Sequence, residues 1–266
     1  MTGTGTGVTG LRRFAARSTA APAGPVGPVG TAGPAGPAGP AARAAQGPHP
    51  GPAAAADADG AERCEMCREV LDGRHGHVVE VEQRSIVCAC RACYLLFLSE
   101  GAAGGKYRSV PERVRHDPDT PLDDADWNEL QIPVAMAFFF VNSALGRVVA
   151  GYPSPGGMTE CELDLAAWDR LVAAYPLFAA MTPDVEAVFV NRAEPDREVF
   201  LLPIDQCYSL VGELRLRWQG FDGGAEAHAA LASFLAGLRS SALALAPGER
   251  RDGRQARREH VPGARG

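Results

Sequence analysis

Two Cys-x-x-Cys pairs constrain the fold of this chain more than any other feature. They are Cys64 with Cys67 and Cys90 with Cys93, and 22 residues separate the pairs. Two intervening residues let the chain curl so that both thiolates of a pair reach one ion, and two pairs supply the four ligands of a tetrahedral site. Cysteines that were only small buried side chains would not need this spacing. We therefore predict that the four cysteines bind one metal ion, zinc in a structural role.

Residues close to these pairs leave the ligand set open. Cys88 lies two residues before Cys90, so three cysteines compete for two places. A continuing strand would put Cys88 and Cys90 on the same face, whereas the Cys-x-x-Cys turn favours Cys90 with Cys93. His75 and His77 could replace a thiolate as a ligand, or they could orient a metal ligand by a hydrogen bond without binding the metal themselves. We expect these two histidines to be surface residues of a hairpin.

Other chemistries of paired cysteines fit the sequence less well. Rubredoxin-like iron uses the same four thiolates, but its turns carry glycine after each pair, where this chain has Arg68 and Tyr94. Iron, or an iron–sulfur cluster held by the five clustered cysteines, stays the alternative to zinc. A thiol oxidoreductase needs a βαβ pattern beside its Cys-x-x-Cys, and a nuclease needs a histidine paired with aspartate or histidine in the hairpin. The sequence has neither.

Residues 61–115 form the predicted metal module. Alternation predicts a hairpin with strands 77–82 and 85–88 around a turn at Gln83–Arg84, and a short helix at 94–98 ends before the loop 101–105. A first cysteine pair, a hairpin and a second pair at a helix start are typical of a treble clef. A zinc ribbon with two knuckles is the neighbouring alternative.

Residues 116–246 are predicted to form an α+β domain, so the fold class is α+β. Trp127–Leu130 begins a helix or turn, and Ser154–Gly157 is interpreted as a loop. Asp205 to Tyr208 is a polar cluster at the end of an apolar strand, where a binding or catalytic group could lie, and we favour its interpretation as a helix cap with a buried cysteine. The expected strands are 132–142, 147–152, 185–191 and 198–204, and the expected helices are 162–175 capped by Asp164, 208–218 capped by Asp205, and 225–243. The segment 208–218 is ambiguous, because Leu214, Leu216 and Trp218 also fit a strand, and we favour the helix.

Composition separates two tails from this body. Residues 1–60 are rich in Ala, Gly and Pro with Phe14 as the single aromatic residue, and residues 247–266 are rich in Arg. Neither tail has enough large apolar side chains to offset the entropy of ordering, so both are predicted to be disordered. Residues 61–246 carry 16 basic and 27 acidic side chains, a net charge of −11, which disfavours nucleic-acid binding.

The sequence also excludes several common functions and locations. It has no phosphate-binding GxxxxGK[ST], GxGxxG after a strand, GxSxG or HExxH motif. No segment approaches the ~20 apolar residues of a membrane span, and Arg12-Arg13 is not followed by the apolar core of an export signal. We expect a cytoplasmic protein, in which seven cysteines point to metal or reactive thiols before disulfides.

Several segments resemble a family of uncharacterised actinobacterial proteins. They are Leu11–Phe14, the RCEMC and CACRACYLLF segments, Lys106–Arg108 with Val110–Pro111, Val190–Arg192 and Pro203–Tyr208. Members of this family lie beside genes for a high-affinity uptake nickel–iron hydrogenase. The resemblance implies a role in maturation, assembly or electron supply around a hydrogenase, and it implies Cys64, Cys67, Cys88, Cys90 and Cys93 as the metal cluster.

Taken together, the residues and the resemblance predict a non-enzymatic accessory protein. Zinc would hold the small module, and the α+β domain would bind a protein partner, such as a hydrogenase subunit or maturation factor. The alternative is an electron-transfer protein with iron at the same cysteines.

Overall fold

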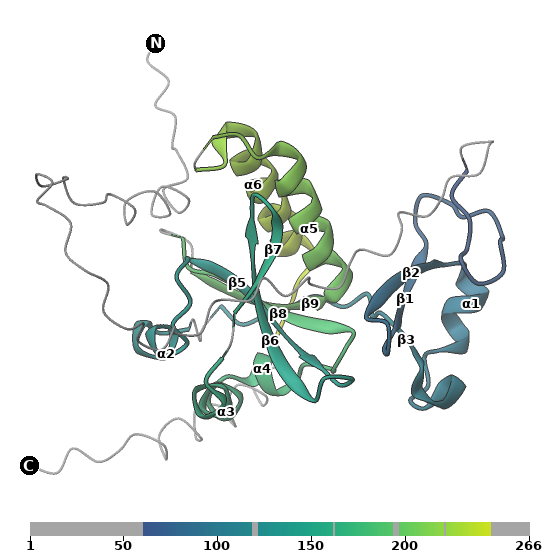
Figure 1. The fold of residues 1–266 in the computed structure, drawn as a ribbon, viewed down its shortest axis with the longest axis horizontal. Coiled ribbons are helices and arrows are strands. Elements are labelled where there is room, and N and C mark those ends of the chain that lie inside the picture. The colour runs from purple at the N-terminus through teal and green to yellow at the C-terminus, as the bar shows by residue number, and fades with distance from the viewer. Residues whose placement is uncertain (1–60, 119–121, 162, 194–196, 221, 246–266) are drawn as a thin grey trace, which may run out of the picture.

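The computed structural model of the protein describes residues 61–118, 122–161, 163–193, 197–220 and 222–245. The predicted tails lie outside the described residues. Within the described part, a small three-stranded sheet and a seven-stranded sheet form a mixed α+β structure, as the sequence predicts (Figure 1).

The larger sheet has the strand order β10-β4-β9-β8-β5-β6-β7. All neighbouring strands pair antiparallel except β10 and β4, which pair parallel. Every residue of β8 is buried, because helices cover both faces of the sheet. The strands are β4 (Arg115–His116), β5 (Met136–Asn142), β6 (Arg147–Ser154), β7 (Gly157–Cys161), β8 (Glu186–Asn191), β9 (Glu198–Pro203) and β10 (Leu243–Ala244).

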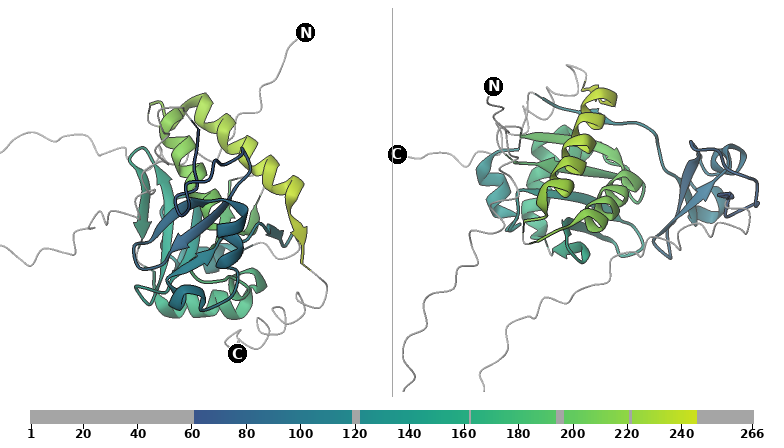
Figure 2. Two further views of the ribbon diagram at one scale, coloured as in Figure 1. Left: turned by 90° about the vertical axis from the view of Figure 1, so that its right-hand side faces the viewer. Right: turned by 90° about the horizontal axis from the view of Figure 1, so that it is seen from above.

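Adjacent phenylalanines of β5 pack on opposite helical layers. The ring of Phe139 lies 6.1 Å from Trp168, on the side covered by α2, α3 and α4. Phe138 stacks on Phe189, whose ring meets Phe234 of α6. Helices α5 and α6 cover this face of the sheet (Figure 2). The helices are α2 (Asp124–Glu129), α3 (Leu165–Ala174), α4 (Pro176–Ala179), α5 (Ile204–Arg217) and α6 (Gly224–Ser241).

Two helix starts test the predicted caps. The Asp164 carboxylate accepts a hydrogen bond of 2.8 Å from the backbone N–H of Ala167, so the predicted cap of α3 is confirmed. Helix α5 is also present, but Asp205 does not cap it. Pro203 holds the N-cap position, and the Asp205 side chain turns instead toward His77.

The metal module contains the predicted hairpin with one further strand. The hairpin turns over Val81–Arg84, slightly earlier than predicted, and a short 3-10 helix, η2 (Ala102–Gly105), precedes the third strand. Helix α1 starts within the second cysteine pair, three residues before the predicted helix. The elements are β1 (Gly76–Glu80), β2 (Ser85–Ala89), α1 (Arg91–Leu96) and β3 (Tyr107–Ser109), and the sheet order is β2-β1-β3.

Three further elements differ from the predictions. The segment expected as a loop at Ser154–Gly157 is the tight turn of a β6–β7 hairpin, in which Gly157 has a φ of 116°. Strand β5 begins at Met136 and not at Ile132. Strand β4 begins at Arg115, next to the predicted domain boundary, and pairs with β9.

The module packs against the larger sheet. Val79 of β1 and Val110 and Val114 of the connecting segment belong to the same buried core as the seven-stranded sheet. Arg108 donates to the carboxylate of Asp184, at 3.3 Å. Both apolar and ionic contacts therefore join the two parts.

Candidate metal centre

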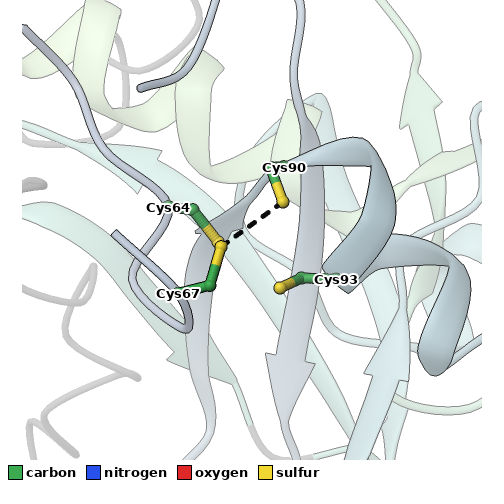
Figure 3. Close-up of side chains that lie close together, drawn as sticks. All are labelled: Cys64, Cys67, Cys90 and Cys93. Atoms are coloured by element: carbon green, nitrogen blue, oxygen red, sulfur yellow. Dashed lines mark hydrogen bonds between the residues drawn. The ribbon is translucent and has the colours of Figure 1, made fainter. Parts of the chain in front are cut away.

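The first cysteine pair lies in a tight backbone loop. Arg63 and Val70 form an isolated antiparallel bridge, and inside it the N–H of Arg68 donates to the carbonyl of Cys64 at 2.8 Å. The N–H of Cys64 in turn donates to the carbonyl of Glu69 at 2.8 Å. These bonds fold the chain back on itself, so that Cys64 and Cys67 lie on one side of the loop (Figure 3).

The second pair lies where β2 ends and α1 begins. Cys90 is the N-cap residue of α1, and its carbonyl accepts from the N–H of Tyr94 at 2.9 Å. Cys93 lies in the first turn of the helix. Glu65 ties the first loop to β2, because its carboxylate accepts from the N–H of Cys88 at 2.8 Å and its own N–H donates to the carbonyl of Cys88.

The four sulfur atoms lie within 4.8 Å of one another. The Cys67 and Cys90 sulfurs are 3.6 Å apart (Figure 3). Tetrahedral zinc with bonds of 2.3 Å would separate its sulfurs by about 3.8 Å, which is close to this value. Cys64 and Cys93 are buried and Cys67 is exposed. The four cysteines could therefore hold one metal ion at the edge of the module, and the choice among ligands stays a prediction.

Protonation of the cluster is uneven. Burial alone would raise the pKa of Cys64, but the backbone N–H groups of Cys90, Cys67 and Met66 outweigh it and lower the pKa to about 6. Burial and the neighbouring thiols raise the pKa of Cys93. Without a cation, the thiolate of Cys64 therefore forms more readily than that of Cys93. A divalent cation would supply the charge that ionises all four.

The backbone at Arg68 changes one argument from the sequence. Arg68 has a φ of 68°, the left-handed conformation that glycine favours at this place in rubredoxin-like turns. The missing glycine therefore does not prevent the first loop from forming, and it counts less against iron than the sequence indicates. Tyr94 differs, because it lies inside helix α1.

Cys88 belongs to a second group and not to the four cysteines. It lies directly opposite His77 in the β1–β2 register. A ring nitrogen of His75, a ring nitrogen of His77 and the sulfur of Cys88 lie within 4.8 Å of one another. The histidines, which we expected on the hairpin surface, are both partly buried.

Asp205 completes this second group from the other part of the chain. Its carboxylate lies 2.6 Å from Nδ1 of His77, so the ring nitrogen donates. The hydrogen bond to Asp205, with the contact to Cys88, raises the pKa of His77 to about 10. The contact of Asp205 with His77 could not be predicted, since no local pattern relates it to a histidine 128 residues away.

No helix in the described ranges is long and apolar enough to cross a membrane.

Comparisons with known proteins give one match. The model of a family of unknown function, DUF5947, matches residues 63–242, which include both cysteine pairs and all strands of the two sheets except β10. No curated protein and no solved structure matches the chain.

Proposed function

The chain belongs to the DUF5947 family of unknown function, and from the geometry of its cysteines we propose that it is a non-enzymatic accessory protein with a structural zinc site. The observation that carries the proposal is the convergence of four cysteines from three segments. The first loop brings Cys64 and Cys67, the end of β2 brings Cys90, and α1 brings Cys93. One ion would tie all three segments together, in the arrangement of a treble clef.

The module has only a small core of its own beside its contacts with the larger sheet. Apart from the two buried cysteines, its own core consists of Val78, Ala89 and Tyr94. A unit of this size is only marginally stable by its own burial, and bound zinc contributes on the order of 10 kcal/mol. Stabilisation of the fold is therefore the role that the cluster serves best.

An apolar surface on α1 supports a protein partner. Leu95, Leu96 and Leu98 are 46%, 66% and 55% exposed. They lie beside Cys93, Tyr94 and Phe97, which pack inward. Three exposed leucines, two on α1 and one just beyond its C-terminal end, are a surface that a protein partner would cover. We define Leu95, Leu96 and Leu98 as the leucine surface.

The partner that we propose is a hydrogenase subunit or a hydrogenase maturation factor, in the cytoplasm. The support is the resemblance of the cysteine segments and of Pro203–Tyr208 to proteins encoded beside a nickel–iron hydrogenase. The acidic body of the chain supports a protein partner over nucleic acid.

A pull-down from the native host tests the partner. The full chain should retain a hydrogenase subunit or maturation factor, and Leu96→Glu with Leu98→Glu should lose it while keeping the metal. Leu216→Glu is the matched control, since Leu216 is 88% exposed on α5 in the other part of the chain. The proposed partner would be rejected if the double variant and Leu216→Glu retained the hydrogenase protein equally, or if the unchanged chain retained no hydrogenase protein.

Electron transfer by iron at the same four cysteines is the second candidate. The observation in its favour is the left-handed backbone at Arg68, together with backbone N–H groups that point at the Cys64 sulfur. Elemental analysis and visible absorption of anaerobically purified protein separate the two functions. Zinc without iron supports the structural role, whereas iron with absorption that dithionite bleaches supports the carrier.

A further inference from the structure

We propose that His75, His77 and Cys88 form a second metal site, separate from the four cysteines, which binds a divalent transition ion such as Zn²⁺ and opens onto a cleft. Two imidazoles and one thiolate are ligands that ions of this class prefer.

The hairpin fixes the three side chains on one face. His77 and Cys88 are partners across β1 and β2, and His75 precedes His77 by two residues, so it points the same way. Val78, the next residue of β1, points to the opposite face and packs there with the buried cysteines Cys64 and Cys93. Val79, on the His77 face, joins the core of the larger sheet. The two groups of ligands thus lie on opposite faces of one sheet.

Both histidines are already oriented as metal ligands are. Nδ1 of His77 donates to the carboxylate of Asp205, and Nδ1 of His75 lies 3.2 Å from the backbone carbonyl of Asp72. A histidine that binds a metal through one ring nitrogen characteristically donates the other N–H to a carboxylate or a carbonyl. These bonds leave Nε2 of each ring as the nitrogen that an ion could bind, and at His77 the ion would displace the proton that the raised pKa keeps on the ring.

Nε2 of His75 is the main evidence for an ion at this place. It is buried and has no hydrogen-bond partner. A buried polar atom without a partner is costly, and such atoms call for an explanation such as an ion. An ion held also by His77 and Cys88 would satisfy it.

A cleft of about 740 Å³ gives the ion a free coordination position. Both histidines and Asp205 line it, and so do Arg74 and Arg91 together with the acidic residues Asp72 and Glu112; Cys88 is not among its lining residues. Three protein ligands leave one position of a tetrahedral ion open, as in sites that bind an exchangeable ligand.

A nucleophilic cysteine is the rival interpretation of the same residues. Cys88 lies beside His77, and His77 is hydrogen-bonded to Asp205, so the three could act as a thiol nucleophile, a base and the group that orients the base. This arrangement has no use for His75 and leaves its Nε2 unsatisfied, whereas a metal ion uses all of these side chains.

Cobalt titration of the metal-free full chain tests the proposal. The wild type should bind two equivalents of Co²⁺, and His75→Ala or Cys88→Ala should bind one, with the thiolate-to-cobalt absorption of the four-cysteine site retained. His228→Ala and Cys161→Ala should bind two. His228 is the matched control, because its Nε2 is also buried without a partner but it belongs to neither group of ligands. His75→Gln, a milder change, replaces His75→Ala if the latter misfolds.

Three results would overturn the second site. One is a wild type that binds a single equivalent, which would leave the four-cysteine site untouched. Another is two equivalents in both His75→Gln and Cys88→Ala. The third is alkylation of Cys88 by iodoacetamide as fast in cobalt-loaded protein as in metal-free protein, which would favour the nucleophile. Azide should shift the cobalt d–d bands of the wild type but not those of Cys88→Ala, and an unshifted wild type would refute the open position.

Discussion

Arg113→Ala should destabilise the protein strongly, because it removes one half of a buried ion pair. Arg113 lies in the segment that joins the metal module to β4. Its Nε and Nη2 donate to the two carboxylate oxygens of Glu186 at 2.6 and 2.7 Å. The Glu186 side chain is fully buried, whereas that of Arg113 is 45% exposed.

The cost of the change follows from this asymmetry. Loss of the guanidinium leaves a buried carboxylate with the backbone N–H of Thr182, 3.0 Å away, as a remaining donor. Breaking a buried pair typically costs about 3–5 kcal/mol, and we expect the lower end because water can enter where Arg113 was. Glu186→Gln should cost less, about 1–2 kcal/mol, since the half-exposed Arg113 can be solvated again.

The cost should depend on pH with a definite sign. Burial would raise the pKa of Glu186, but Arg113 and Thr182 outweigh it and hold the pKa below its ordinary value. The pair therefore stabilises the folded state above the pKa of the unfolded carboxyl, and this stabilisation is lost as the pH falls through the folded pKa. In Arg113→Ala burial prevails, so the carboxyl is protonated more easily and the difference from wild type shrinks at acid pH.

Urea unfolding of the metal-loaded full chain, followed by tryptophan fluorescence at pH 7 and pH 5, measures these differences. Arg217→Ala is the control, because Arg217 and Glu213 form an exposed pair on α5 at 3.3 Å and should contribute under about 0.5 kcal/mol. If Arg113→Ala cost no more than Arg217→Ala at pH 7, or cost more at pH 5 than at pH 7, the reasoning would be refuted.

Three further changes have expected outcomes. Cys93→Ser should lose the metal of the four-cysteine site and unfold the module while the large sheet stays folded, which limited proteolysis would detect. Full metal content in this variant would contradict the ligand assignment. The control Cys161→Ser should change neither the metal content nor the proteolysis pattern. Asp205→Asn should weaken cobalt binding at the second site 10–100-fold in a competition titration, because His77 loses the carboxylate that orients it; unchanged affinity would count against that role. Asp164→Ala should cost about 1 kcal/mol in thermal unfolding through loss of the α3 cap, whereas Asp169→Ala, exposed on the same helix, should cost little.

Local patterns in the sequence predicted the elements whose stability depends on near neighbours. Alternation identified the β1–β2 hairpin, the continuous apolar runs identified β8 and β9, and Asp164 marked the start of α3. The segment 208–218 was ambiguous between helix and strand. Burial of Leu210 and Leu214 with exposure of Leu216 shows the helical spacing.

Features that depend on distant partners could not be predicted in this way. Strands β4 and β10 have two residues each, too few for any periodicity, and exist because β9 pairs with β4. The second role of Asp205 depends on His77 reaching it from the module. The partners of Cys88 depend on strand register. The register places Cys88 opposite His77, and the pairing stops at Ala89, so Cys90 lies outside the strand.

The β1–β2 hairpin makes the second group of ligands depend on the four cysteines, but not the four cysteines on the second group. Ala89 and Val87 of β2 face the four-cysteine side, whereas Ile86 and Cys88 face the other part of the chain. The second group exists only when the register of β1 and β2 is in place, and that register rests on the small core around Cys64 and Cys93. The four cysteines come from the first loop, the end of β2 and α1, and they require neither histidine nor Asp205. Metal at the four cysteines would therefore be a condition for metal at the second site, and the reverse dependence would not hold.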